Sequence, residues 1–296
     1  MLPVLIVMAI AEILLRQMPN DYKRKKTLLE KYAVNIEVLC LGSSHSYYNI
    51  NPAYFSMPAF NAAHSSQTLN YDWFLLRKYQ DSLPRLQYIL LPISYQSLFE
   101  SLDDAAESWR IKDYKLYYDI NENNYLPYNF EVLSMPPRFN FNKIINYYGW
   151  HNYMPAMNEF GYAITYHSSV KNDLQKMGRE AAARNYFPNK KHVEENLGYL
   201  QKIIDWAAKR NVQVMLFTSP AFESYRQHLD SVQINTTQQA IKKLVSDYKN
   251  VSYYNLINSP TFSSSDFYDA DHLNEIGAKK FTFILNQLIT KNKAQQ

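Results

Sequence analysis

The stretch IEVLCLGSSHS, residues 36–46, decides the fold. Its first six residues form a short apolar run that ends at Gly42, a pattern typical of a buried β-strand followed by a turn. Three serines and a histidine follow at once, and Cys40, the single cysteine, lies inside the run. We therefore expect a strand over 36–41, with Cys40 in the core and polar side chains at the strand's carboxyl end.

Outward from this strand, the chain repeats the same alternation of strands and helices. Apolar runs indicate further strands over 59–62, 88–91, 212–217 and 251–256. Apolar residues at helical spacing predict helices over 69–79, 192–210, 236–248 and 274–289, the last capped by Asp271 or Asn274. Strands that alternate with helices form parallel sheets with right-handed crossovers. The sequence therefore predicts an α/β fold with a five-stranded parallel sheet.

Residues from about 97 to 190 interrupt this rhythm and are rich in Tyr, Asn and Pro. A segment of this length is too long to be a plain loop in a compact domain. We expect a mainly helical insertion whose tyrosines fill a core. The predicted organisation is an N-terminal segment over 1–30 and one domain over 31–296 that contains the insertion.

The N-terminal segment is apolar from Leu2 to Leu15 except for Glu12, and a basic cluster follows at 23–26. The apolar run is shorter than the ~20 residues that span a bilayer. Part of a membrane anchor, the apolar region of a signal peptide and a buried helix all fit it, although the basic cluster after the run opposes export by the positive-inside rule. We favour the anchor, and we expect an extracytoplasmic protein held at the cell membrane by this segment.

Composition excludes several classes of protein. The net charge is only +4 and the basic residues are mostly scattered, so we expect no nucleic-acid partner. With six glycines in 296 residues, the chain has no Walker P-loop, no G-x-G-x-x-G fingerprint and no G-x-S-x-G elbow. A lone cysteine excludes an internal disulfide and a cysteine-rich zinc site. We expect no cofactor.

Three polar clusters follow predicted strands, at 42–46, 61–66 and 269–272. Ligands of open parallel sheets bind outside the carboxyl ends of the strands. A serine hydroxyl becomes a nucleophile only when an imidazole removes its proton and a carboxylate orients that imidazole. Asp269 and His272, three residues apart, can supply both groups, and Ser44 can supply the hydroxyl. Backbone N–H groups of the serine-rich turns can form an oxyanion hole.

Two of these clusters resemble motifs of the SGNH (GDSL-like) hydrolases. Residues 41–45 (LGSSH) resemble the G-D-S block, with Ser43 in place of Asp, and residues 268–278 (YDADHLNEIGA) resemble the D-x-x-H-x-N-x-x-G block. The resemblance covers 35–95 and 195–290 and is nearest to membrane-tethered DltD-like and alginate O-acetylation-like members. It implies a three-layer flavodoxin-like fold with Ser44 as nucleophile, His272 as base and Asp269 as its orienting carboxylate.

The sequence departs from the family pattern at two oxyanion positions. Ser66 stands where the second block has a glycine, and Ser94 is the nearest substitute for the asparagine of the third block. With His45 and Asn61, they make up the predicted oxyanion and substrate-binding residues. His45 and His64 lack a carboxylate at ligand spacing, so we expect no metal site.

These residues predict a serine-dependent acyl-ester hydrolase or O-acyltransferase that works through an acyl-Ser44 intermediate. The resemblance implies an O-acetyl group on a cell-surface glycan. A non-catalytic accessory protein that binds glycan or a membrane acyltransferase partner is an alternative, as is a soluble intracellular esterase. The distance between Ser44 and His272 separates the enzyme from the accessory protein.

Overall fold

The computed structural model describes residues 1–152 and 154–294. The chain forms two compact units, one made of Met1–Leu28 and Leu102–Ala156 and a larger one made of Leu29–Ser101 and Met157–Gln296. The segment expected as one insertion over 97–190 thus contributes to both units.

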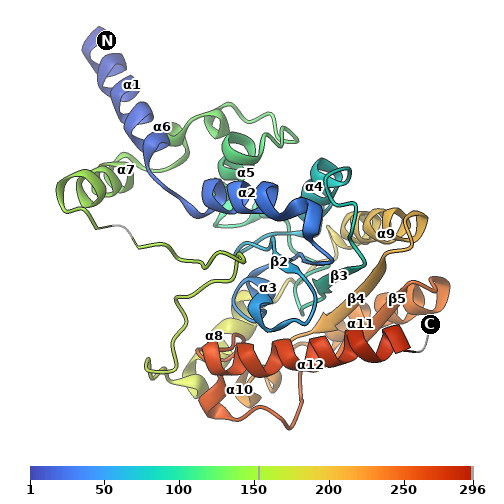
Figure 1. The fold of residues 1–296 in the computed structure, drawn as a ribbon. Coiled ribbons are helices and arrows are strands. Elements are labelled where there is room, and N and C mark those ends of the chain that lie inside the picture. Colours follow the sequence, from blue (N-terminus) through green and yellow to red (C-terminus); the bar gives the residue numbers. More distant parts are fainter. Residues whose placement is uncertain (153, 295–296) are drawn as a thin grey trace. The chain divides into compact units, whose positions relative to one another are not determined.

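The larger unit contains a sheet of five parallel strands. These are β1 (Val38–Cys40), β2 (Ala59–Asn61), β3 (Tyr88–Pro92), β4 (Gln213–Thr218) and β5 (Val251–Asn255). Their order is β2-β1-β3-β4-β5, with every neighbouring pair parallel (Figure 1). This is the flavodoxin-like order, in which ligands bind where the crossovers from β1 and β3 diverge. The prediction of a five-stranded parallel α/β fold is confirmed.

Helices of the larger unit connect the strands and cover both faces of the sheet (Figure 1). They are α3 (Ser44–Tyr47), α4 (Leu69–Tyr79), α8 (Leu174–Arg184), α9 (Val193–Lys209), α10 (Glu223–Arg226), α11 (Ser231–Asp247) and α12 (Glu275–Ala294), with 3₁₀ turns at Ala33–Asn35, Pro52–Tyr54 and Ser264–Asp266. The side chain of Asn274 accepts the N–H groups of Ile276 and Gly277, so Asn274 caps α12, one of the two residues proposed for that role. Helix α11 begins five residues before its predicted start because the side chain of Asp230 accepts the N–H of Gln233.

The two faces of the sheet bury alternate residues of its central strands. On one face, Cys40, Leu90 and Phe217 pack with Phe281 and Leu285 of α12. The residues between them in sequence, such as Leu39, Ile89 and Leu216, are equally buried and point to the opposite face. Helix α9 packs against β4 and against α4. The sheet thus forms the middle of three layers, as expected, and the prediction that Cys40 is buried is confirmed.

The smaller unit is helical and has no strands among its described residues. It contains α1 (Leu2–Gln17), most of α2 (Asp21–Tyr32), α5 (Ile111–Tyr118), α6 (Glu131–Ser134), α7 (Pro137–Ile144), the π-helical turn η6 (Ile145–Gly149) and 3₁₀ turns at Leu102–Asp104, Ser108–Arg110 and Leu126–Asn129. Tyr22 meets Tyr114 edge to face at a centroid distance of 5.2 Å, and Tyr114 and Tyr118 are fully buried. Tyrosines therefore do form a core here, as the composition predicted.

Within the part of the chain that the structure describes, no single helix is long and apolar enough to cross a membrane. Helix α1 together with the following helical segment Asp21–Asn35 meets the same criteria as a pair, bent by 42°.

Candidate active site

A serine near the start of the chain meets a histidine and an aspartate near its end, beyond the carboxyl end of β1. The Oγ atom of Ser44 lies 2.8 Å from Nε2 of His272. On the other side of the ring, Nδ1 of His272 lies 2.9 Å from Oδ1 and 3.1 Å from Oδ2 of Asp269. The structure thus brings together the predicted nucleophile, base and carboxylate within hydrogen-bond distance. This order of groups can move a proton from a hydroxyl to an imidazole that a carboxylate stabilises.

The turn after β1 fixes Ser44 at the start of α3. Gly42 has a φ of +104°, which side chains rarely allow, and a Cβ there would lie 2.4 Å from ring atoms of Pro92. Its N–H donates to Oδ1 of the buried Asp72 at 2.6 Å. Ser43 is extended, so the helix begins at Ser44. The glycine is therefore required by both the backbone conformation and the closeness of β3.

The loop between the Ser264–Asp266 turn and α12 holds His272 by its own hydrogen bonds. Oδ1 of Asp269 accepts the backbone N–H groups of Asp271 at 3.1 Å and His272 at 2.8 Å, the geometry of an Asx turn. The next residue, Leu273, donates its N–H to Oδ1 of Asn49, just after α3. Asp269 therefore positions the backbone of His272 as well as its ring, and Asn49 ties the loop to the Ser44 segment.

A second carboxylate, Asp271, lies on the same side of His272. Its Oδ1 is 3.5 Å from Nδ1 of His272, and its Oδ2 is 3.8 Å from Nε2 of His45. The ring of His45 stacks on that of His272 at a centroid distance of 4.9 Å. The sequence offered Asp271 only as a possible helix cap. The signal that could have found it is the D-x-D-H spacing, which puts two acidic residues within three positions of the histidine.

Charges around His272 decide its basicity. Burial lowers the pKa of His272, but Asp269 and Asp271 outweigh burial and hold that pKa well above its usual value. Burial raises the pKa of Asp271, and the neighbouring imidazoles of His272 and His45 bring it well below its usual value. Asp271 is therefore ionised at neutral pH, and His272 is a stronger base than an isolated histidine.

Two of the four predicted oxyanion and substrate-binding residues have their side-chain groups engaged inside the protein. The amide of Asn61 donates to the carbonyls of Ser46 and Ile50 and so ties α3 to β2. The hydroxyl of Ser94 bonds Nδ1 of His45 at 2.5 Å, and its backbone N–H donates to Ser97. These contacts fit positioning more directly than contact with substrate.

The other two predicted oxyanion and substrate-binding residues, His45 and Ser66, differ in how exposed they are. His45 is 5% exposed and lies behind the ring of His272. Ser66 is half-buried and has a φ of +58°, a left-handed conformation that residues other than glycine seldom adopt. A strained backbone of this kind is frequent at functional sites. The role of Ser66 as an N–H donor to an oxyanion stays a prediction.

Three tyrosines that sequence reasoning did not single out stack beside the site. The rings of Tyr48 and Tyr166 are 3.7 Å apart and 4° from parallel, and those of Tyr166 and Tyr268 are 3.8 Å apart and 12° from parallel. Tyr48 and Tyr166 each stand almost perpendicular to His272 at 5.7 Å. All three rings are half-buried. They form a partly exposed aromatic surface next to the Ser44–His272 pair.

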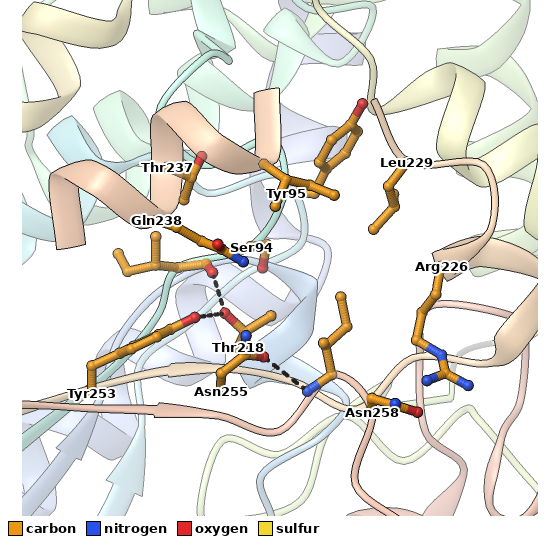
Figure 2. Close-up of a pocket in the computed structure, with 13 residues that line it drawn as sticks. Ser94, Tyr95, Thr218, Arg226, Leu229, Thr237, Gln238, Tyr253, Asn255 and Asn258 are labelled. Atoms are coloured by element: carbon orange, nitrogen blue, oxygen red, sulfur yellow. Dashed lines mark hydrogen bonds between the residues drawn. The ribbon is translucent and has the colours of Figure 1, made fainter. Parts of the chain in front are cut away.

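A cavity of about 290 Å³ lies at the carboxyl ends of β3, β4 and β5 (Figure 2). Its walls are mainly apolar, and they include Ser94, the partner of His45. Thr218 donates to the carbonyl of Ile93 and bonds the hydroxyl of Tyr253. Arg226 stands at its edge, with its Nε buried and without a hydrogen-bond partner. The cavity therefore adjoins the active site through Ser94, which bonds His45.

His45, Asp271 and His272 are the described His, Cys, Asp or Glu residues whose ligand atoms lie close enough together for a metal ion, within 4.8 Å of one another. Both Nδ1 atoms already have partners, since His272 bonds Asp269 and His45 bonds Ser94. The two rings also stack rather than converge on a point. This arrangement fits a proton-handling cluster better than a metal site, and the expectation of no metal stays a prediction.

No protein-family model matches the chain, and no curated protein is significantly similar to it. Among solved structures, it is similar to a protein from Streptococcus pneumonia described as a candidate platelet activating factor, with 15% identity and a TM-score of 0.46 over 97% of this chain and 99% of that one. A candidate acylhydrolase from Bacteroides fragilis has 12% identity and a TM-score of 0.41, over 89% and 96% of the two chains. A GDSL-like lipase from Bacteroides thetaiotaomicron has 10% identity and a TM-score of 0.44, over 92% and 100%.

Proposed function

We propose that the protein is a serine-dependent ester hydrolase or acyltransferase with Ser44 as its nucleophile. The observation that carries this proposal is the chain of contacts from Ser44 through His272 to Asp269, at 2.8 Å and 2.9 Å. A hydrogen bond from nucleophile to base, and from base to an orienting carboxylate, is the geometric signature of an activated serine.

The reaction follows from these contacts. Nε2 of His272 takes the proton of Ser44 as Oγ attacks the ester carbonyl, and Asp269 stabilises the imidazolium that forms. The imidazolium then gives this proton to the departing alkoxide, which leaves an acyl group on Ser44. Water or an acceptor hydroxyl attacks the acyl-enzyme, again losing its proton to His272. The proton next passes to Oγ of Ser44, and the free serine is restored.

For the substrate, we propose an O-acetyl group on a cell-surface glycan, acted on outside the cytoplasm by an enzyme held to the membrane through its N-terminal segment. The stack formed by Tyr48, Tyr166 and Tyr268 supports a sugar substrate, because aromatic faces and edges beside a nucleophile suit the apolar faces of sugar rings. The apolar helix α1 supports the location. Hydrolysis and transfer differ only in whether water or a hydroxyl of a second glycan reaches the acyl-enzyme.

The alternative of a non-catalytic accessory protein, a binder of glycan or of a membrane acyltransferase, predicts a serine outside the reach of the histidine. The distance of 2.8 Å between Ser44 and His272 favours the enzyme instead.

The experiment is hydrolysis of p-nitrophenyl acetate, together with labelling by a serine-reactive phosphonate. Ser44→Ala should abolish both the turnover and the label. Ser46→Ala is the matched control, because the Ser46 hydroxyl is buried without a hydrogen-bond partner two positions along the same helix; this variant should keep both. If the wild-type protein neither turns over the ester nor takes the label, the proposal fails.

A further inference from the structure

Most of the first ten residues of α1 are exposed, on all sides of the helix. Leu2, Val4, Leu5 and Val7 are each more than half exposed, as are Ile6 and Ile10. A helix that is apolar around its whole circumference is normally buried in a protein core or in a membrane. Ten residues make about 15 Å of helix, which is about half of the ~30 Å hydrocarbon core of a bilayer.

The second half of α1 is fixed to the rest of the smaller unit by polar contacts. Glu12, the one charge in the apolar run, accepts the N–H groups of Glu131 and Val132 at the start of α6. Arg16 donates to the carbonyl of Asn129, and the hydroxyl of Tyr148 donates to the carbonyl of Leu14. The apolar half of α1 therefore projects from a base made by α6, α7 and η6 (Figure 1).

This base carries its own exposed apolar side chains, which we call the belt. Trp150 is 74% exposed, Phe141 63% and Met154 83%. The other members of the belt are Leu133, Phe139 and Ile145. These side chains lie on or just after α6, α7 and η6, of which α6 and α7 pack against α1. Single exposed apolar residues are ordinary on protein surfaces, but several large ones in one short stretch of chain can mark an interaction surface. Tryptophan and other aromatic residues gather where membrane proteins pass from hydrocarbon to head groups.

Charge is unevenly distributed within the smaller unit. The segments that carry α1 and the belt, 1–28 and 125–156, contain seven basic and three acidic residues. The segment between them, 102–124, contains three basic and six acidic residues. Basic residues beside an apolar surface are attracted by anionic lipid head groups. A protein partner would need to surround α1 on all sides, whereas lipid hydrocarbon does this without a specific shape.

We propose that the smaller unit docks on a lipid bilayer with the first half of α1 in the hydrocarbon and the belt at the level of the head groups. The belt lies more than a hundred residues after α1 in the sequence, so this surface goes beyond anchoring by the N-terminal segment alone. The proposal is independent of the chemistry at Ser44.

The test uses the full chain with vesicles of phosphatidylcholine and phosphatidylglycerol at 3:1, in which part of the phosphatidylcholine carries bromine on its acyl chains near the glycerol. Bromine quenches tryptophan emission at contact. The chain has four tryptophans, of which only Trp150 belongs to the belt. We expect brominated vesicles to quench part of the emission, and Trp150→Phe to remove the quenched part.

A second measurement compares vesicle partitioning of two double variants. Phe141→Ser with Trp150→Ser should lower partitioning at least tenfold, because these side chains leave water on docking. Phe283→Ser with Tyr186→Ser is the control, since both residues are aromatic and exposed, at 44% and 46%, but belong to the larger unit; it should partition as the wild type. All four residues are surface-exposed, so circular dichroism and thermal unfolding should show intact folds.

Three results would overturn the proposal. They are an unquenched Trp150, belt variants that partition like the wild type, and a lipid-free dimer that buries Trp150 against a second copy or another protein. Activity on a soluble ester is measured separately. Absence of vesicle binding with normal ester turnover would reject the docking surface and leave the proposed chemistry at Ser44 intact. Vesicle binding without ester turnover would reject that chemistry and leave the docking surface intact.

Discussion

Replacing Asp269 and Asp271 with asparagine, singly and together, tests how two carboxylates share the stabilisation of His272. In a Ser–His–Asp triad with one carboxylate, its replacement by asparagine lowers kcat by about 10⁴-fold. Here Oδ1 of Asp269 lies 2.9 Å from Nδ1 of His272, and Oδ1 of Asp271 lies 3.5 Å from the same atom. When either charge is removed, the other remains to stabilise the imidazolium.

The expected losses follow from these distances. A hydrogen bond to a charged group is worth about 1.5–3 kcal/mol, and about 1.4 kcal/mol corresponds to a tenfold change in rate. Asp269→Asn removes a contact of hydrogen-bond length and should lower kcat by about 10²-fold. Asp271→Asn removes a longer contact and should lower it by about tenfold. The double variant should lose about 10⁴-fold, more than the product of the single losses.

The assay is kcat and kcat/KM for p-nitrophenyl acetate between pH 5 and 9. His272 acts as a base only when neutral, and its pKa is raised by the two carboxylates over the opposing effect of burial. The acid limb of the profile should therefore lie above pH 6.5, and Asp271→Asn should move it to lower pH. If Asp269→Asn alone loses the full ~10⁴-fold while Asp271→Asn changes neither kcat nor the acid limb, Asp271 has no part in stabilising the base.

Three further substitutions test the turn, the buried acid and the aromatic stack. Gly42→Ala should lower the free energy of unfolding in urea by about 3 kcal/mol, from backbone strain and overlap with Pro92; an unchanged urea midpoint would contradict the close approach. Burial raises the pKa of Asp72 to about 7, against smaller opposing effects of hydrogen bonds from Gln67 and Gly42, so wild-type stability should fall by up to about 4 kcal/mol as pH rises from 4 to 8. Asp72→Asn should remove that slope, and a slope equal to wild type would show that Asp72 ionises normally. Tyr166→Ala removes the ring packed between Tyr48 and Tyr268 and so disrupts the aromatic surface. It should raise KM for an acetylated oligosaccharide about fivefold more than KM for p-nitrophenyl acetate, which corresponds to about 1 kcal/mol of lost aromatic contact; equal changes would remove the support for a sugar substrate.

The sequence predicts the sheet well because each central strand lies in a run made mostly of apolar residues. Buried parallel strands need apolar residues on both faces. Residues 36–41 and 212–217 can therefore be predicted as strands from the sequence alone. Boundaries are harder to predict where a cap decides them. Helix α11 was expected from 236, but Asp230 starts it at Ser231. A side chain that caps a helix gives no periodic signal of its own, so the apolar spacing alone missed the first turn.

Some residues of the site can be predicted from the sequence and others cannot. Ser44, Asp269 and His272 can be singled out because each follows an expected strand in a recognisable local pattern. Tyr166 could not be predicted, because it lies in an irregular segment and tertiary structure alone brings it against Tyr48, Tyr268 and His272. Asn61 and Ser94 were expected to face the substrate. Their positions in the sequence do not show which groups their side chains bond. The side chain of Asn61 bonds α3 and that of Ser94 bonds His45, and only the tertiary structure brings these partners near.

The two acidic residues of the D-x-D-H stretch act on His272 in physically different ways. Asp269 accepts two backbone N–H groups as well as the ring nitrogen, so its charge is shared among three donors and it fixes the position of the imidazole. Oδ1 of Asp271 is buried without any hydrogen bond and lies just beyond hydrogen-bond length of the ring. Its Oδ2 accepts a hydrogen bond from Nδ2 of Asn185 at 3.3 Å, which holds the carboxylate in place beside the ring. A charge in a buried site acts over a longer distance than the same charge in water. Asp271 can therefore stabilise the imidazolium without orienting it, and a contact of 3.5 Å at this site has an effect that its length alone would not suggest.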